Sequence, residues 1–135
     1  MNGSYNENGQ VFLRKLENSV FVYLVYNMTD PNLNTLNQYF QFRRAGDTNA
    51  CLQLMSPDVV LVSQKDGTFQ GKDGLRQYLQ KNPFQGEWNR PYYSPVDRCY
   101  RADGLVKIFF LPVRVKILCD LNSEGLIKKV WIGRL

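Results

Sequence analysis

The feature that most constrains the fold is a series of helix and strand boundaries between residues 45 and 85. The first boundary is Gly46, which follows a run whose apolar side chains recur every three or four residues. This spacing predicts a helix over residues 31–45, because glycine is typical of the position that ends a helix. Asp47 then predicts the N-cap of a short second helix. Two consecutive helices are therefore expected before the first strand.

The next boundaries predict a strand and a third helix. Pro57-Asp58 opens the apolar run Val59–Val62, which predicts a strand over residues 58–64. Gly71-Lys72-Asp73 predicts the start of a third helix, since an acidic residue there complements the positive end of the helix dipole. That helix is expected to end before Pro83, because the residue preceding a proline disfavours helical geometry.

The rest of the chain predicts β-strands, because apolar and polar residues alternate along it. We expect these strands at residues 87–94, 96–103, 105–121 and 126–134. Ala102-Asp103-Gly104 and Asn122–Gly125 are predicted turns. Helices followed by a long antiparallel sheet indicate an α+β fold.

The length of 135 residues fits a single domain, for which we expect residues 31–135, preceded by an N-terminal extension over 1–30. Residues 1–10 are expected to fray. The segment 11–28 is compatible with a β-hairpin, which its β-branched residues favour, or with a largely apolar helix. Its apolar run Val20–Tyr26 is too short to span a bilayer, so no membrane partner is expected.

Composition excludes several kinds of site. The sequence contains no histidine, and Cys51, Cys99 and Cys119 lack metal-ligand spacing, so no metal, no cofactor and no Cys–His or Ser–His catalytic pair is expected within one chain. Reduced, partly buried thiols are expected, which indicates a cytoplasmic protein. The net charge of +5 is dispersed in short pairs such as Arg43-Arg44, which is typical of solvated faces, so nucleic acid is not an expected partner.

The order of elements and the residues at their boundaries resemble the nuclear transport factor 2-like superfamily, also called SnoaL-like or cystatin-like. In nuclear transport factor 2 itself, Phe-Gln-Gly-Lys is followed at the same distance by Pro-Phe-Gln, which matches Phe69–Lys72 and Pro83–Gln85. The resemblance implies three N-terminal helices packed in the concave face of a curved, mostly antiparallel sheet, with a conical pocket. The aromatic residue that the transport factor uses for nucleoporin repeats has no counterpart at Ser63-Gln64.

Ketosteroid isomerases provide a second comparison within this superfamily. Their helix also ends in Ala-Gly-Asp, and Tyr39 occupies the position of their oxyanion-hole tyrosine relative to Asp47. Their two catalytic carboxyl groups correspond in position to Ser63 and Ile117, neither of which can act as the required acid or base. The comparison therefore implies that the isomerase reaction is absent.

Strand parity predicts which side chains line the pocket, because alternate residues of a strand face the same way. The lining is expected to be apolar, and Tyr39 is either its polar anchor or, as is commoner for such a residue, a core tyrosine with a satisfied hydroxyl. The predicted lining residues are Tyr39, Val59, Leu61, Ser63, Tyr78, Val113, Val115, Ile117 and Val130. Aromatic residues on either side of Pro91 are expected either to form the pocket rim or to cover the sheet edge: Trp88, Tyr92 and Tyr93.

The last strand predicts an apolar outer face. Ile127 and Trp131 alternate with Val130 and Ile132, so the first pair is expected to face outward if the second pair faces the interior. An apolar outer face predicts a homodimer that buries it. Coverage by the N-terminal segment is the alternative.

Four charged residues invite comparison with the Asp–Arg–Asp arrangement of limonene epoxide hydrolases, in which two carboxylates activate water and protonate an epoxide. They are Asp97, Arg98, Arg101 and Asp103. On a strand Arg98 points away from the others, and Asp103 is expected in a turn. The favoured interpretation is a set of surface charges.

The sequence thus favours a non-catalytic, dimeric binding module for a small apolar ligand or a protein partner, and no catalytic residue is assigned. The alternative is a SnoaL-like isomerase, cyclase, lyase or hydrolase that acts on a hydrophobic small molecule. In that enzyme Tyr39 and an acid such as Asp58 or Asp97 would transfer protons. A nucleocytoplasmic transport adaptor is the third hypothesis.

Overall fold

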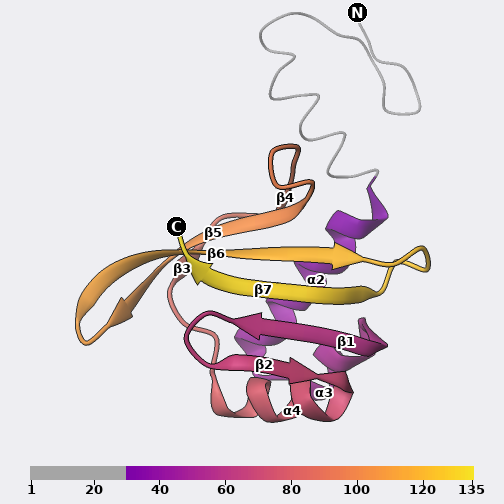
Figure 1. The fold of residues 1–135 in the computed structure, drawn as a ribbon, viewed down its shortest axis with the longest axis horizontal. Coiled ribbons are helices and arrows are strands. Elements are labelled where there is room, and N and C mark those ends of the chain that lie inside the picture. The colour runs from indigo at the N-terminus through magenta and orange to yellow at the C-terminus, as the bar shows by residue number, and fades with distance from the viewer. Residues whose placement is uncertain (1–29) are drawn as a thin grey trace, which may run out of the picture.

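The computed structural model describes residues 30–135, in which three helices and a seven-stranded sheet are formed (Figure 1). The helices are α2 (Pro31–Ala45), α3 (Thr48–Gln53) and α4 (Gly71–Lys81). The strands are β1 (Met55–Ser63), β2 (Gly67–Gln70), β3 (Glu87–Trp88), β4 (Tyr92–Ser94), β5 (Cys99–Ile108), β6 (Leu111–Leu121) and β7 (Ile127–Arg134). The frayed tail and the hairpin or helix expected before Asp30 lie outside the described residues.

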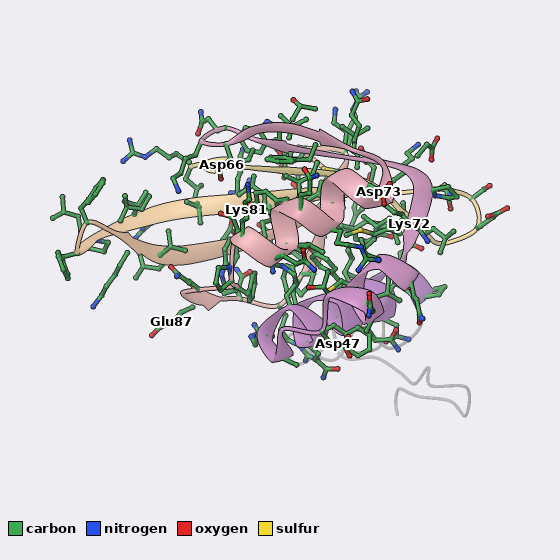
Figure 2. The ribbon with its side chains drawn as sticks, turned by 90° about the horizontal axis from the view of Figure 1, so that it is seen from below. Asp47, Asp66, Lys72, Asp73, Lys81 and Glu87 are labelled. Carbon is green, nitrogen blue, oxygen red and sulfur yellow. The ribbon has the colours of Figure 1, made fainter. Side chains whose placement is uncertain are left out.

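The sheet is mostly antiparallel, which agrees with the predicted α+β fold. Its strand order is β2-β1-β7-β6-β5-β3, and β4 pairs with β5. β1 and β7 run parallel and join the N-terminal part of the sheet to the C-terminal meander. The hairpin of β5 and β6 is the longest pair, and its end extends beyond the helices (Figures 1 and 2).

The helix boundaries follow the capping residues of the sequence. The Oδ1 atom of Asp30 accepts a hydrogen bond from the backbone N–H of Asn32 at 2.9 Å and so caps α2. That helix ends at Gly46, whose φ of 73° is the left-handed conformation that glycine adopts without steric cost. Asp47 caps α3 by accepting the N–H of Ala50 at 3.1 Å. These boundaries confirm the predicted positions of the first two helices.

The core lies between the helices and the inner face of the sheet. In Figure 2, α4 crosses this face with Lys72 and Lys81 near its two ends. The buried side chains of α2 are Leu33, Leu36, Tyr39 and Phe40, and those of α4 are Leu75, Tyr78 and Leu79. None of the helices in residues 30–135 is long and apolar enough to cross a membrane.

The turn predicted at Ala102-Asp103-Gly104 is wrong. These residues lie within β5, and the chain reverses instead at Phe109 and Phe110. Gly104 serves close packing, because a β-carbon at this position would collide with the ring of Trp88. The predicted strand 105–121 is therefore divided into the end of β5 and the whole of β6.

The outward orientation predicted for Ile127 is also wrong. Ile127 is 0% exposed and lies in the hydrophobic core, paired with Met55 of β1. The register of β7 shifts against β1 before Val60, and against β6 after Asp120. Between the paired positions β7 advances two residues where β6 advances one and β1 advances five, so the parity of β7 is reversed against both neighbours. Ile127 therefore faces inward together with Val130 and does not belong to an outer face.

Candidate functional site

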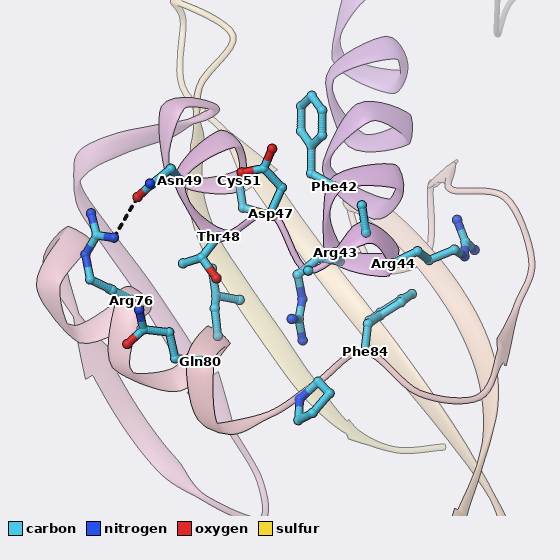
Figure 3. Close-up of a pocket in the computed structure, with 14 residues that line it drawn as sticks. Phe42, Arg43, Arg44, Asp47, Thr48, Asn49, Cys51, Arg76, Gln80 and Phe84 are labelled. Carbon is cyan, nitrogen blue, oxygen red and sulfur yellow. Dashed lines mark hydrogen bonds between the residues drawn. The ribbon is translucent and has the colours of Figure 1, made fainter.

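A cavity of about 640 Å³ lies where the ends of the three helices meet (Figure 3). It is bounded by the C-terminal ends of α2 and α4 and by the N-terminal end of α3. Cys51 and Leu79 reach it from the core, and Phe42 and Phe84 supply aromatic walls. We call this feature the arginine cavity, because Arg43, Arg44 and Arg76 line it.

Arg43 is held in a defined orientation. One of its Nη atoms donates a hydrogen bond to the backbone carbonyl of Asn82 at 2.9 Å. Asn82 is itself fixed at the end of α4, because its side-chain amide donates to the carbonyl of Tyr78 at 2.9 Å. The Arg43 guanidinium carbon also lies 5.2 Å from the centre of the Phe84 ring. A guanidinium carries five N–H donors, so a bond to one carbonyl leaves donors for a ligand.

The other two arginines add positive charge at the rim. The guanidinium carbon of Arg44 lies 5.6 Å from the Phe84 ring centre, and Arg76 donates to the side chain of Asn49 at 2.7 Å (Figure 3). The carboxylate that lines the same cavity, Asp47, is engaged as the N-cap of α3. The three guanidinium groups and one carboxylate leave an excess of positive charge that favours an anion.

Cys51 supplies a thiol among the described residues that line the arginine cavity. Burial raises the pKa of Cys51 to about 11, although Arg43 opposes this shift, so the thiol is protonated and a poor nucleophile. Behind it, burial raises the pKa of Tyr39 further above its ordinary value. All three cysteines are buried and unpaired. Within residues 30–135, no three side chains of the metal-binding types lie together.

The residues predicted to line an apolar pocket form the core instead. Tyr39, Val59, Leu61, Tyr78, Ile117 and Val130 are members of one buried cluster. Val115 is buried further along β6, and Val113 is half-buried. Strand parity thus correctly predicted that the strand residues of this cluster share the inner face of the sheet. They do not line an open pocket there, because they pack against one another and against the helices. The arginine cavity is lined by a different set of residues.

Ser63, also predicted to line the pocket, stabilises a turn. Its hydroxyl donates to Oδ2 of Asp66 at 3.2 Å and accepts the backbone N–H of Asp66 at 3.0 Å. These two bonds close the connection between β1 and β2. The residue predicted to be catalytically inert thus has a structural role in this turn.

An Asp–Arg–Asp arrangement does form. Arg101 donates through Nε to Asp103 at 2.7 Å and through Nη1 to Asp97 at 3.0 Å. Ser94 donates to Asp97 at 2.7 Å, and Tyr92 donates to Asp103 at 3.1 Å. The hydrogen bond from Ser94, followed by that from Arg101, lowers the pKa of Asp97. A carboxylate held in its ionised form is a poor general acid, so the network is better suited to bracing β4 against β5.

This network is separated from Tyr39 by the sheet. Arg101 lies opposite Leu118, and the neighbouring pair of Ala102 and Ile117 faces the core with Tyr39. Arg101 therefore belongs to the outer face, because neighbouring residues of a strand point to opposite faces. The other acid considered with Tyr39, Asp58, is exposed and accepts a hydrogen bond from Ser56 at 2.7 Å.

The three aromatic residues predicted at the rim do not form one group. The ring of Trp88 stacks on Phe84 with 5.5 Å between ring centres, so it lies beside a wall of the arginine cavity. Tyr92 belongs to the Asp–Arg–Asp network. Tyr93 is exposed and makes an edge contact with Tyr100 at 5.3 Å.

Trp131, predicted on the outer face, borders a second cavity of about 370 Å³ together with Leu118 and Cys99. The ammonium group of Lys116 lies 5.8 Å from its ring centre. Trp131 is partly exposed, whereas Ile127 contributes nothing to this surface. The outer face is therefore mixed in character and less apolar than predicted.

Sequence reasoning did not find the arginine cavity. It interpreted Arg43-Arg44 as part of a solvated face, although the pair lies in the last turn of a helix that ends at Gly46. One feature of the sequence could have indicated the cavity: this pair of arginines lies beside a predicted junction of two helices. Nothing in the sequence indicated that Phe84 would pack against both arginines.

Solved structures resemble this chain in fold. No family model and no curated protein sequence matches it. An NTF2-like protein of unknown function from Cytophaga hutchinsonii superposes with a TM-score of 0.65 at 9% identity, covering 77% of this chain and 89% of its own. A cystatin fold protein from Novosphingobium aromaticivorans gives 0.63 at 15% identity, covering 76% and 97%. The epoxide hydrolase/cyclase-like enzyme SalBIII, from pyran ring formation in salinomycin, gives 0.56 at 12% identity, covering 77% and 90%.

These similarities, together with the helices on one face of a curved sheet, establish the nuclear transport factor 2-like, or cystatin-like, fold. The resemblance inferred from the motifs at the element boundaries is thereby confirmed at the level of fold. At such low identities the likeness carries no chemistry from SalBIII to this chain.

Proposed function

We propose that the protein is a non-catalytic binding module whose ligand is a small organic anion held in the arginine cavity. The observation that carries this proposal is the excess of guanidinium groups over carboxylates among the lining residues. Guanidinium groups bind carboxylates and phosphates through paired N–H donors, which gives geometric specificity as well as affinity. Arg43, already oriented by Asn82 and Phe84, is the anchor.

The body of the ligand is expected to be aromatic or apolar. Phe42, Leu79 and Phe84 line the cavity beside the arginines and offer apolar surface to a ring or an alkyl group. The volume of about 640 Å³ lies within the range of roughly 300–1,000 Å³ that is typical of small-molecule sites. An apolar ligand in the interior would instead have to separate packed core side chains, so the arginine cavity is the favoured site.

Binding is favoured over catalysis because the described ionisable residues that line the cavity beside the arginines, Cys51 and Asp47, are not available for proton transfer. Cys51 is protonated there, since burial raises its pKa to about 11. Asp47 is occupied as a helix cap. The enzyme hypothesis also loses its proposed partners for Tyr39, because Asp97 is bonded to Arg101 on the outer face and Asp58 is exposed.

Calorimetry and amide NMR with phenyl phosphate and benzoate test this function. Both anions should bind and shift resonances of residues 42–51 and 76–84, whereas benzyl alcohol, which has a ring and no charge, should not. Arg43→Gln should weaken phenyl phosphate binding at least tenfold. Arg98→Gln, which removes the same charge from an exposed position outside the cavity, is the matched control. Equal binding to wild type and Arg43→Gln would refute the proposal.

We also propose that the module is a homodimer that buries Trp131 at its outer face. Support comes from the partial exposure of this large aromatic ring on a strand central to the sheet, beside Leu118 and an adjoining cavity. An isologous dimer places the same patch of both copies in contact. Lys116 then stays over the Trp131 ring at the edge of the interface.

A further inference from the structure

The end of the β5–β6 hairpin is an exposed apolar projection. We call residues Ile108–Pro112 the hairpin tip. Phe109 is 90% exposed, Phe110 is 94% exposed and Leu111 is 66% exposed. The hairpin carries them away from the helices and the rest of the sheet (Figures 1 and 2). Three large apolar side chains at one projecting point are unusual for a surface that only water contacts.

The backbone of the hairpin tip is strained. Phe109 and Phe110 have φ values of 51° and 66°, the left-handed conformation that disfavours bulky side chains. Two-residue hairpin turns of this kind ordinarily contain Asn-Gly or a similar pair. The two phenylalanines therefore lower the stability of the turn, and their exposed rings recover little of it by packing within the fold. Strain of this kind is typically retained where the side chains have a use.

The hairpin tip is apolar on both faces of the hairpin. Ile108 pairs with Leu111, and the next pair is Lys107 with Pro112. Paired residues share a face and successive pairs alternate, so Leu111 and Pro112 lie on opposite faces, with the two phenylalanine rings at the end. A protein partner that packs on one face would leave the other face in water. An apolar medium that surrounds the tip accommodates both faces.

Positive charges flank the hairpin tip on the side toward the domain. Lys107 and Arg114 are exposed, one on each strand. At a rise of about 3.4 Å per residue, two positions separate the Lys107 backbone from the turn at Phe109 and Phe110 by about 7 Å, which lies within the depth of roughly 5–10 Å that interfacial segments reach in a bilayer. Among the described carboxylates of this region, Asp103 lies further back, whereas Glu87 lies level with Arg114 because both pair with Leu105. Asp103 is bonded to Arg101.

We propose that the hairpin tip inserts into the interfacial layer of a lipid bilayer that contains anionic headgroups. Phe109, Phe110 and Leu111 enter the boundary of the acyl chains, while Lys107 and Arg114 contact the headgroups. This is attachment to one leaflet by a strand hairpin and involves no membrane-spanning segment. The expectation that no membrane partner exists considered spanning segments alone. The proposal does not depend on the ligand of the arginine cavity.

Cosedimentation of the full chain with vesicles tests the proposal. Wild type should sediment with vesicles of phosphatidylcholine and phosphatidylserine, and much less with phosphatidylcholine alone. The double variant Phe109→Asn/Phe110→Gly should lose at least tenfold in vesicle affinity. Because it introduces the residues that this turn prefers, its melting temperature should stay the same or rise. If the variant loses vesicle binding while its fold stays intact, the two rings serve membrane binding and are not required for the stability of the fold.

The charge contribution has its own matched pair of variants. Lys107→Gln/Arg114→Gln should reduce binding to the anionic vesicles severalfold. Lys128→Gln/Lys129→Gln removes the same charge and should leave binding unchanged. Lys128 and Lys129 lie near the start of β7, which pairs with the end of β6 opposite the hairpin tip.

Three kinds of result would overturn the proposal. The first is wild type that does not sediment with anionic vesicles, or Phe109→Asn/Phe110→Gly that sediments as well as wild type. The second is a lipid-free dimer that this variant converts to a monomer in sedimentation velocity, which would identify the tip as an interface between copies. The third is a loss of hydrogen-exchange protection at residues 20–26 in the lipid-free variant, which would show that the chain covers its own tip.

Discussion

The guanidinium carbon of Arg43 lies 5.2 Å from the centre of the Phe84 ring, and Arg44 approaches the same ring at 5.6 Å. Phe84 follows α4, whereas both arginines lie in the last turn of α2. One aromatic ring thus contacts two cations, which restricts both side chains before any ligand arrives. A ligand that binds Arg43 therefore meets a side chain that is already ordered. The entropy cost of ordering it has been offset by contacts within the protein, so it does not reduce the affinity for the ligand.

Phe84→Leu should weaken binding of phenyl phosphate while leaving the charge of the cavity intact. A cation–π contact contributes about 0.5–2 kcal/mol, so the loss in affinity should lie between about twofold and thirtyfold in calorimetry. Tyr93→Leu, which removes an exposed aromatic ring from β4, serves as the control. Undiminished affinity in Phe84→Leu would show that the ring does not position the arginines.

Trp131→Glu should convert the proposed dimer to a folded monomer in sedimentation velocity. The substitution places a charge at the centre of the proposed interface, and Trp131 lies outside the buried core cluster, so the melting temperature should change little. Val96→Glu adds the same charge at an exposed apolar residue of the turn before β5 and should leave the dimer intact. Wild type that is monomeric at high micromolar concentration would contradict the dimer.

Ile117→Asp should destabilise the fold by several kcal/mol, because Ile117 is 4% exposed within the core. Burial should raise the pKa of the new carboxyl group above its value in the unfolded chain. The folded state then binds the proton more tightly, so the free energy of unfolding should fall as the pH rises from about 4 toward neutrality.

The comparison for this prediction is Ile117→Asn, which is polar but does not titrate. Urea unfolding should show a difference between the two variants that grows with pH. If Ile117→Asp has the stability of wild type at every pH, residue 117 faces water and the register of β6 is mistaken.

Gly104→Ala should cost about 1–3 kcal/mol of stability, since the added methyl group must displace the Trp88 ring or the strand that carries it. Combining it with Trp88→Leu should recover part of the loss, because the smaller side chain vacates the space. The four proteins of this double-mutant cycle can be compared by urea unfolding. Additive losses would show that the ring and the glycine do not share a contact.

The elements that could be predicted correctly depend on interactions within a few positions of the chain. Asp30 caps α2 through the residue two positions on, and Asp47 caps α3 through the residue three positions on. Gly46 ends α2 through the carbonyls of its own last turn. Such contacts are present in the local sequence, so the order of helices and the α+β class followed from it.

The predictions that failed concern long-range geometry. The turn at Phe109 and Phe110 carries no sequence signal of a turn, whereas Gly104 carries one and lies within a strand to admit the ring of Trp88. Parity was correct for Val130 but failed for Ile127, because the register shifts between them. Whether a strand contains an added residue depends on how that strand pairs with its two neighbouring strands. The local sequence therefore carries no pattern that would predict it.

The sequence by itself determined where α2 and α4 begin and end, where α3 begins, and which side chains of α2 and α4 face the core, since periodicity and capping act over one or two turns of a helix. Only the tertiary structure decided the candidate site. Arg43 reaches the carbonyl of a residue 39 positions later, and Phe84 joins them from beyond the end of α4. Side chains so distant in the chain meet only after burial of the core has set the angle between the helices, and that angle is a property of the packed whole.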